Sequence, residues 1–275
     1  MTRVALFQST SGIDPAANGR ALIDAVEQAA AGGAEMLFTP EMSGLLDRDS
    51  ARAAKVIRPQ DEDRVLPGVQ EAAARNHVWV HIGSLAVLTQ SGKVANRSFV
   101  IDREGQVRAT YDKMHLFDVD LPSGESWRES NVYSPGSNVV VVNGTPVGKL
   151  GLTICYDLRF PGLFARLAES DADVIAVPAA FTVPTGKAHW HVLLRARAIE
   201  AGLFVIAAAQ AGNHEDGRTT FGLSLVVDPW GEVLLDMGEE RGVAFADIDL
   251  SRISDVRSRI PALNHRRPIP DAVTL

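Results

Sequence analysis

The chain has 275 residues and a formal net charge of −7, with 46% hydrophobic residues, 22% charged residues and a single cysteine. This composition is typical of a globular α/β chain that buries a substantial core, and the negative charge argues against non-specific nucleic-acid binding. One cysteine excludes an intramolecular disulfide and favours a reducing, cytoplasmic environment. The amino terminus lacks a signal-peptide pattern, and no run approaches about 18 apolar residues, so we expect no membrane span.

The first half of the chain alternates strand and helix patterns. Apolar runs predict strands at 4–7, 36–39 and 78–82. Apolar residues at helical spacing predict helices around 22–30, ended by Gly32 and Gly33, and over 66–74. Two further strands, 98–101 and 107–111, flank an Asp-Arg-Glu-Gly turn and predict a hairpin before a long polar segment, 113–138.

The second half repeats the same style. Apolar runs predict strands at 139–142, 149–154, 173–178, 203–207, 223–227, 233–235 and 243–248. Helical spacing predicts helices at 163–168 and from about 188 to 201. An Asp-Pro-Trp-Gly turn joins two of these strands. The order predicts an α/β fold of mixed sheets covered by helices, in a single domain over 1–275.

The only cysteine, Cys155, stands at the carboxyl end of the strand predicted at 149–154, directly before a new helical pattern. A strand-to-helix corner lifts a side chain off the sheet edge, where ligands bind in α/β proteins. A thiol there can act as a nucleophile if a neighbour takes its proton. The alternative is that a lone cysteine is only a small buried hydrophobe.

Two charged residues, Glu41 and Lys113, also stand where strands are expected to end. Glu41 could accept the proton of Cys155 and pass it to a leaving amine. Lys113 could favour the thiolate and stabilise an oxyanion. They lie 72 (113 − 41) and 42 (155 − 113) residues apart in the sequence, so only the fold could bring the three together. Taken singly, each charge is more commonly solvated or structural.

Three sequence contexts resemble the signatures of the nitrilase superfamily of carbon–nitrogen hydrolases. They read Thr-Pro-Glu-Met at 39–42, Tyr-Asp-Lys-Met-His-Leu-Phe-Asp at 111–118 and Leu-Thr-Ile-Cys-Tyr-Asp-Leu-Arg-Phe-Pro at 152–161. The similarity extends over essentially the whole chain and is closest to the Nit branch, which includes ω-amidase and deaminated glutathione amidase. It implies a four-layer α-β-β-α sandwich. It also implies a homodimer with an α-β-β-α-α-β-β-α assembly, to which the segment from about 250 to 275 contributes.

The resemblance implies a role for each matched residue. Cys155 would be the nucleophile, Glu41 the general base and Lys113 the oxyanion-stabilising cation. Members of the family use a second glutamate between the lysine and cysteine motifs. Glu129 matches that element, and Glu125 is a competitor because its neighbouring residues imitate the same pattern.

Four residues are candidates for substrate binding. The resemblance implies that the backbone N–H of Tyr156 is a second oxyanion donor. The guanidinium of Arg159 could bind a substrate carboxylate in a bidentate pair. A structural salt bridge with a neighbour such as Asp157 is an equally supported alternative. Phe117 and Phe181 are expected to wall the pocket.

No metal or cofactor is expected. His189 and His191 point in different directions on a helix and make a poor chelate, and no cysteine or histidine cluster supports zinc. His115 is expected to support the site rather than act as its base, and Trp190 is expected in the core. One departure from the family pattern is Leu223, at a position where related sequences commonly have a histidine. Details of the pocket that are carried over from those sequences are therefore in doubt.

The implied reaction is hydrolysis of a small non-peptide amide, such as a dicarboxylate or α-keto acid monoamide, through a thioester. Ammonia or an amine would be released. An N-carbamoyl amide hydrolase or a nitrilase would use the same residues, and these alternatives stay open because bond specificity depends on pocket shape. A different hypothesis is that the chain is a catalytically inactive homologue that acts as a binding scaffold. The three intact catalytic motifs argue against it.

Overall fold

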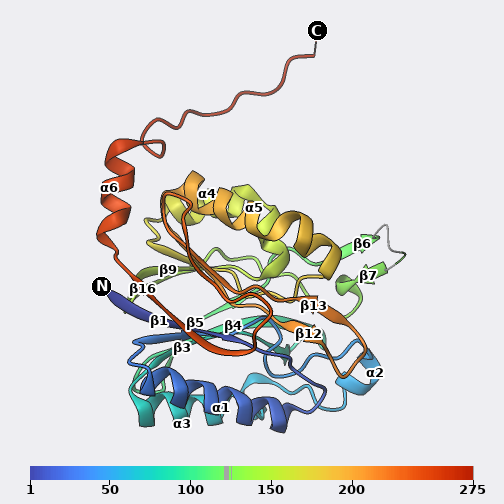
Figure 1. Ribbon diagram of the computed structural model, residues 1–275. Coiled ribbons are helices and arrows are strands. Elements are labelled where there is room, and N and C mark those ends of the chain that lie inside the picture. Colours follow the sequence, from blue (N-terminus) through green and yellow to red (C-terminus); the bar gives the residue numbers. More distant parts are fainter. Residues whose placement is uncertain (121–123, 125, 275) are drawn as a thin grey trace.

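The computed structural model describes residues 1–120, 124 and 126–274. Its elements form four layers, a helical layer, two six-stranded sheets face to face, and a second helical layer (Figure 1). This α-β-β-α sandwich confirms the architecture that the sequence resemblance implied. The layers position the site, because the strands of both sheets end around one cavity.

The first sheet has the strand order β16-β1-β2-β3-β4-β5. The strands are β1 (Thr2–Gln8), β2 (Met36–Phe38), β3 (Trp79–Leu88), β4 (Val94–Ile101), β5 (Val107–Asp112) and β16 (Gly242–Ile248). The three central strands β1, β2 and β3 run parallel, and the other neighbours are antiparallel. Helices α1 (Pro15–Ala31) and α3 (Leu66–Asn76) cover its outer face (Figure 1).

The second sheet has the strand order β15-β14-β11-β10-β9-β8. The strands are β8 (Val141–Thr145), β9 (Gly148–Leu152), β10 (Val174–Ala176), β11 (Phe204–Ala207), β14 (Leu225–Val227) and β15 (Val233–Asp236). Helices α4 (Pro161–Glu169) and α5 (Val183–Ala201) cover its outer face (Figure 1). The main core lies between the sheets, where Leu6 and Phe38 meet Leu152 in one buried cluster.

Helix α1 shows how local chemistry sets an element. The side chain of Asp14 accepts a hydrogen bond from the backbone of Ala16, and Pro15 occupies the first turn. Gly32 caps the other end, and Gly33 follows with a φ of +74°, a conformation that favours glycine. The helix therefore ends at the residues that the sequence indicated.

Several elements differ from the sequence expectations. Helix α5 begins at Val183 rather than near 188, because a proline in its first turn starts it earlier. Strand β3 continues past 82 to Leu88 through a register shift. No apolar pattern indicated three short helical elements, which are α2 (Ser50–Ala53), the 3₁₀ turn η1 (Gln60–Glu62) and α6 (Ser251–Arg259). Two short antiparallel strand pairs were also not indicated. They are β6 (Asp118–Asp120) with β7 (Ser126–Arg128), and β12 (Ala211–Asn213) with β13 (Thr219–Phe221).

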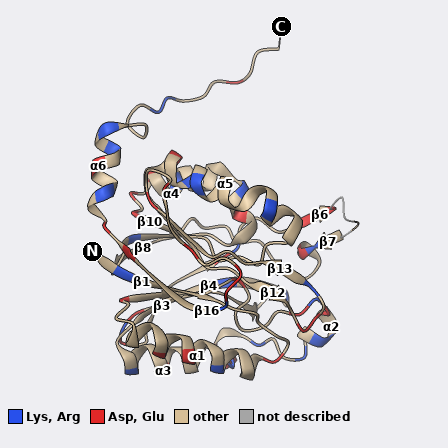
Figure 2. Ribbon diagram, in the orientation of Figure 1, with Lys and Arg blue, Asp and Glu red and all other residues tan. Residues whose placement is uncertain are grey.

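Charged residues are concentrated on the helices and loops, and the strands between the helical layers carry few of them (Figure 2). Helix α6 packs on the sandwich through Ile253, which lies in the main core, and Arg257, which donates to the carbonyls of Ala172 and Ala201. The end of the chain after α6 extends away from the four layers (Figure 1). Among the described residues, no helix combines the length and the apolar character needed to cross a bilayer. Because most charged residues lie on the helices and loops, a charged side chain buried between the two sheets is an exception that needs an explanation.

Candidate active site

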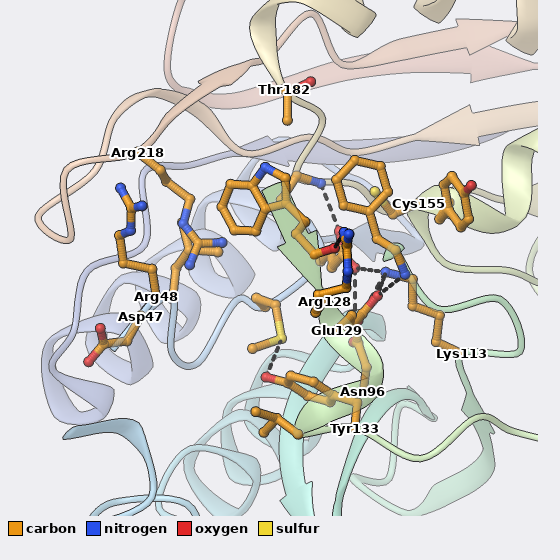
Figure 3. Close-up of a pocket in the computed structure, with 18 of the residues that line it drawn as sticks. Asp47, Arg48, Asn96, Lys113, Arg128, Glu129, Tyr133, Cys155, Thr182 and Arg218 are labelled. Atoms are coloured by element: carbon orange, nitrogen blue, oxygen red, sulfur yellow. Dashed lines mark hydrogen bonds and ion pairs between the residues drawn. The ribbon is translucent and has the colours of Figure 1, made fainter. Parts of the chain in front are cut away.

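Four residues singled out by the sequence meet in one cavity of about 470 Å³ (Figure 3). Glu41 follows β2, and Lys113 follows β5 directly. Glu129 opens the 3₁₀ turn η2 (Glu129–Asn131), and Cys155 opens the turn η3 (Cys155–Arg159) after β9. Both sheets therefore contribute to one site. The competing candidate Glu125 lies outside the described residues.

The ammonium of Lys113 is the centre of the cluster, and the residue is 2% exposed. Its Nζ donates to Glu41 Oε1 at 2.9 Å and to the two carboxylate oxygens of Glu129 at 2.9 and 3.2 Å. Burial alone would lower the pKa of Lys113, but the charges of Glu129 and Glu41 hold that pKa well above its ordinary value. Lys113 is therefore a buried permanent cation.

Glu41 is oriented at both carboxylate oxygens. Besides Lys113, Oε1 accepts from Asn96 Nδ2 at 2.9 Å, and Oε2 accepts from the backbone N–H of Ala180 at 3.0 Å. Burial alone would raise the pKa of Glu41, but the charge of Lys113 and hydrogen bonds from Lys113, Cys155 and Asn96 leave that pKa below its ordinary value. Glu41 is therefore an ionised carboxylate beside the thiol, in the same cavity, and can accept its proton.

Asn96 is a site residue that the sequence analysis missed. It lies on β4, fully buried, and its Nδ2 donates to both Glu41 Oε1 and, at 3.3 Å, Glu129 Oε1. Its backbone carbonyl accepts from the N–H of Lys113 at 2.9 Å. No sequence pattern marked it, because Asn96 stands before Arg97 and Ser98 and ahead of the apolar run that predicted the strand. Asn96 therefore bridges the two carboxylates that bind the ammonium of Lys113.

Glu129 is fixed by the chain on the other side of the cavity. The backbone N–H of Phe117 donates to its Oε2 at 2.7 Å. The Phe117 ring packs edge-on against Tyr156, with ring centroids 5.1 Å apart. Glu129 thus connects the lysine to the aromatic wall next to the cysteine.

Cys155 has a φ of +49°, in the left-handed region, and its N–H donates to the carbonyl of Pro178 at 2.8 Å. A non-glycine residue held there costs about 1–3 kcal/mol and is common at active sites. Burial and the neighbouring Glu41 raise the pKa of Cys155 well above its ordinary value, and the opposing effect of Lys113 does not offset them. The charge of Lys113 therefore acts in the expected direction, toward the thiolate, and is outweighed by burial and by Glu41.

A buried carboxylate, Asp157, ties the cysteine turn to the lysine strand. Its Oδ2 accepts from the N–H of Ile154 at 2.9 Å and from the hydroxyl of Tyr111 at 2.7 Å. Its Oδ1 accepts from the N–H of His115 at 3.0 Å and lies 2.7 Å from Nδ1 of that ring. Tyr111 and His115 flank Lys113 in the sequence. The predicted supporting position of His115 agrees with this geometry.

Arg159 and Tyr156 line the cavity next to Cys155. The guanidinium of Arg159 lies 5.4 Å from the ring centroid of Phe181 and 5.9 Å from that of Tyr156, and its Nη1 is 3.3 Å from His189 Nδ1. The alternative salt bridge with Asp157 is wrong, because that carboxylate is already bound by other groups. Within the described part of the chain, the N–H of Tyr156 has no hydrogen-bond acceptor.

The remaining candidates separate into wall and core. Phe117 and Phe181 line the cavity, as expected. Trp190 is fully buried against Phe181, and its Nε1 donates to the carbonyl of Leu223 at 2.7 Å. Leu223 has a φ of +58°, packs against the main core and does not line the cavity. The departure at Leu223 therefore does not reach the cavity wall.

The described residues include no group of three or more His, Cys, Asp and Glu side chains that could hold a metal ion. The groups present in the cavity are a base, Glu41, a cation, Lys113, and a thiol, Cys155. These groups can take a proton, stabilise negative charge and attack an electrophilic carbon.

Comparisons with known proteins give consistent matches. A family model described as carbon-nitrogen hydrolase matches residues 3–258. The deaminated glutathione amidase of Mus musculus is 39% identical over 269 residues, which cover 96% of this chain and 83% of the relative. The solved structure of the NitFhit protein of C. elegans has a TM-score of 0.89 and 37% identity, over 97% of this chain and 65% of that one.

A third match bears on the cysteine. It is a solved structure of a Glu-to-Gln mutant of the amidase from Nesterenkonia sp. AN1, which shows the Michael addition of acrylamide at the active site cysteine. Its TM-score is 0.79 and its sequence identity 26%, over 95% of this chain and 98% of that one.

Proposed function

This chain belongs to the carbon–nitrogen hydrolase family and is an enzyme of that class, and we propose that it hydrolyses a small non-peptide amide through a thioester on Cys155. The resemblance to the Nit branch is confirmed by the relatives that the chain matches. The observation that carries the proposal is the contact cluster of Glu41, Lys113 and Glu129 beside the only thiol of the chain.

In the first half-reaction, Glu41 accepts the proton of Cys155 as Sγ attacks the amide carbon. The negative charge that develops on the carbonyl oxygen is stabilised by the ammonium of Lys113 and the N–H of Tyr156. The tetrahedral adduct collapses, the carbon–nitrogen bond breaks, and Glu41 returns the proton to the leaving nitrogen. The products at this stage are a thioester on Cys155 and free ammonia or an amine.

In the second half-reaction, water attacks the thioester carbon and Glu41 accepts the proton of the water. The bond from carbon to Sγ breaks, and Cys155 leaves with a proton returned by Glu41. The acid is released and the starting state is restored. Glu129 takes no proton in this scheme, because its part is to keep Lys113 charged and oriented.

We propose that the acyl portion of the substrate carries a carboxylate, as in a dicarboxylate or α-keto acid monoamide. Arg159 supports this, because its guanidinium lines the cavity one turn after the nucleophile and forms no salt bridge with the described residues. A planar guanidinium suits bidentate binding of a carboxylate. The name of the mouse relative points to the same chemistry, since deaminated glutathione has a carboxylate on its acyl portion.

The test is ammonia or amine release from a panel of small amides, nitriles and N-carbamoyl amino acids, run beside Cys155→Ala. We expect turnover of an amide with a carboxylate on its acyl portion, and none by the variant. Turnover of N-carbamoyl compounds or nitriles instead would keep the thiol mechanism and assign another specificity. Silence across the panel, with Cys155 no more reactive than in the unfolded chain, would favour the scaffold hypothesis.

We also propose that the protein is a cytoplasmic homodimer. The single free thiol suits a reducing compartment. Large apolar side chains are exposed on the outer surface around α5 at Val192, Ile199 and Trp230. The end of the chain after α6 extends away from the sandwich (Figure 1). Sedimentation velocity of the whole chain tests the assembly, and a monomer at micromolar concentration would contradict it.

A further inference from the structure

The backbone of Glu41 is bound as closely as its carboxylate, and by residues outside the cavity. The peptide unit between Glu41 and Met42 has both of its polar groups bound by side chains. The carbonyl of Glu41 accepts from Gln210 Nε2 at 3.0 Å, and the N–H of Met42 donates to Ser84 Oγ at 2.8 Å. Within the described part of the chain, no other group binds these two atoms. The placement of the Glu41 side chain therefore depends on Gln210 and Ser84.

The backbone conformation directly after Glu41 needs such support. Met42 has a φ of +56°, in the left-handed region that is disfavoured for residues with a side chain. A backbone in that region persists only while the surrounding contacts hold it. A rotation of the Glu41–Met42 peptide would move the carboxylate of Glu41 relative to Cys155. Loss of either hydrogen bond should therefore displace the general base.

Gln210 is fully buried, and every hydrogen-bonding position of its side-chain amide is used. Its Oε1 accepts from the N–H of Ser11 at 3.0 Å and from Ser9 Oγ at 3.2 Å. Its Nε2 donates to Ser11 Oγ at 2.8 Å and to the carbonyl of Glu41. The N–H of Ser11 can only donate and the carbonyl of Glu41 can only accept, so the orientation of the amide is fixed.

Gln210 also supports the segment that binds the carboxylate of Glu41. Its N–H donates to the carbonyl of Ala179 at 2.8 Å, and the N–H of the next residue, Ala180, donates to Glu41 Oε2 at 3.0 Å. Gln210 follows β11 of the second sheet, whereas Glu41 follows β2 of the first. Neither Gln210 nor Ser84 lines the cavity. One residue of the second sheet thus contacts both the backbone of Glu41 and the segment that binds its carboxylate.

Ser84 reaches the same peptide from the first sheet. It lies fully buried in β3, inside the register shift between Ile82 and Leu85. Irregularities of this kind re-aim side chains next to active sites. The N–H of Ser84 donates to the carbonyl of Pro40 at 3.2 Å, and its carbonyl accepts from the N–H of Ser43 at 2.9 Å. Ser84 therefore binds the loop that carries the base at three points, two through its backbone and one through its hydroxyl.

We propose that Gln210 is a positioning residue for the general base, and that Ser84 assists it. Gln210 holds the Glu41–Met42 peptide so that the carboxylate of Glu41 stays beside Cys155 through both proton transfers. The inference rests on the proposed function, in which Glu41 accepts the thiol proton and returns it to the leaving nitrogen. Gln210 touches no substrate and moves no proton. Its loss should therefore slow the reaction without weakening the binding of the substrate.

The test compares Gln210→Met with Gln8→Met. Gln8 is a matched control, because it is also fully buried and makes four hydrogen bonds between distant segments, with Ser224, Gly238 and Glu240. Methionine keeps the approximate shape of glutamine and removes these hydrogen bonds in both variants. Steady-state hydrolysis of succinamate, a dicarboxylate monoamide, gives kcat and KM.

We expect Gln210→Met to lower kcat by about 10- to 100-fold and to change KM by less than about 3-fold, because the base is displaced and the cavity wall is not. Gln8→Met should leave the kcat of the folded protein within about 2-fold of the unchanged protein. Equal losses of kcat in the two variants, or no loss in folded Gln210→Met, would overturn the positioning role.

A second variant, Gln210→Glu, separates positioning from stability. The introduced carboxyl can donate its O–H to the carbonyl of Glu41 while it is protonated, and it donates nothing once it is ionised. Because burial raises the pKa of this carboxyl, the free energy of unfolding should fall as the pH rises from about 4.3 to the pKa of the folded state, and level off above it.

The kcat of folded Gln210→Glu should fall by about 10-fold as the pH passes the pKa of the introduced carboxyl. In Gln8→Glu the free energy of unfolding should fall with pH in the same way, and the kcat of the folded protein should not. A fall in the stability of Gln210→Glu without a fall in its kcat would refute the positioning role.

Alkylation of Cys155 by iodoacetamide separates this inference from the proposed function, because it needs no turnover. Glu41 raises the pKa of Cys155, so Glu41→Gln should increase the alkylation rate at pH 8 by about 10-fold for each unit by which that pKa falls. Gln210→Met should increase the rate by about 3-fold or more, and Gln8→Met should leave it unchanged.

The two proposals can then fail separately. The expected alkylation rates without turnover of any amide would refute the amidase proposal and keep Gln210 as the residue that positions Glu41. Amide turnover that depends on Cys155, with equal alkylation rates in Gln210→Met and Gln8→Met, would keep the amidase proposal and refute the positioning role.

Discussion

The two faces of the first sheet differ in composition and in purpose. The face toward α1 and α3 is apolar, with Leu37, Ile82 and Phe99 packed on Leu22 and Val69 of the helices. The face toward the second sheet carries buried polar residues at and beyond its strand ends, among which are Gln8, Glu41, His81, Asn96, Ser98 and Lys113. Alternation along each strand produces both faces from one sequence.

Most polar groups on this face have a partner, and the exceptions among the residues named above are Nδ1 of His81 and Oδ1 of Asn96. Gln8 illustrates this, since its Oε1 accepts from the N–H and the hydroxyl of Ser224 at 2.8 and 2.7 Å. An unpaired buried polar group costs about 1–3 kcal/mol. The comparison teaches that the face toward the helices carries packing alone, whereas the face toward the second sheet carries both the main core and the site. Substitutions at the site and on the helix-covered face should therefore have separable effects.

The largest effect should come from the polar face. Glu41→Gln removes the group that accepts the thiol proton, so we expect kcat to fall by about 10²- to 10⁴-fold. The side chain keeps its shape, and the ammonium of Lys113 keeps Glu129 as its counter-ion, so the free energy of unfolding should change less than the barrier does. Steady-state kinetics and urea unfolding measure the two quantities, and a kcat within tenfold of the unchanged protein would contradict the role of Glu41.

A substitution on the apolar face should do the reverse. Leu22 is 1% exposed, and Leu22→Ala should lower the free energy of unfolding by about 2–5 kcal/mol through lost burial and a residual cavity. Its kcat, corrected for the folded fraction, should stay unchanged. Ile23→Ala, at the half-buried next position, is the matched control and should cost less. A loss of kcat in folded Leu22→Ala would show that the two faces are not independent.

The third prediction concerns pH. Burial lowers the pKa of His81 to about 3, and its Nδ1 has no partner among the described residues. The unfolded chain binds a proton at this residue below about pH 6.5 that the folded chain does not bind, so stability falls as the pH decreases from 6.5 toward 3. This group alone should cost about 2 kcal/mol between pH 6.5 and pH 5.

Urea unfolding at the two pH values tests this, beside His81→Gln, in which this contribution should be absent. The depressed pKa of His214 contributes in the same direction in both proteins and cancels in the comparison. The catalytic pair should be indifferent over this range, because the pKa of Glu41 is lowered and that of Cys155 is raised. Equal pH slopes in the two proteins would exclude His81 as the source.

The smallest effect should follow from Leu223→His, which introduces the histidine that the family resemblance implied at this position. Leu223 lies off the cavity wall, and its φ of +58° suits a histidine better than most residues. We expect kcat/KM to change by about 2-fold or less, equivalent to less than about 0.5 kcal/mol. A tenfold change in kcat/KM would mean that residues outside the cavity wall, such as Leu223, also affect catalysis.

Much of this site could be predicted from the sequence, because its residues stand directly after predicted strands or within family signatures. Glu41, Lys113 and Cys155 follow strands whose apolar runs are visible, and their neighbours match family signatures. Glu129 lies where the resemblance implied a second carboxylate, although no pattern of its own marked it. The four layers followed from the same resemblance, since alternation of strands and helices alone indicated only mixed sheets.

Other features depend on contacts that no sequence pattern encodes. Asn96 bridges two carboxylates from the middle of a strand, and Gln210 reaches the carbonyl of Glu41 from the second sheet. The Arg159–Asp157 pair looked plausible from proximity in the chain, but Tyr111 and His115 reach Asp157 from the other sheet. The raised pKa of Cys155 depends on its burial, which a sequence does not quantify.

Asp157 also has a mechanical consequence. Tyr111 and His115, two residues on either side of Lys113, are both bound to the carboxylate that lies two residues after Cys155. Nucleophile and cation therefore belong to one rigid bracket that spans the gap between the sheets. When the two sheets shift relative to each other in thermal motion, these hydrogen bonds should keep the distance between the Cys155 thiol and the Lys113 ammonium constant. A designer who transplants the cysteine turn into another scaffold would have to move the lysine segment with it.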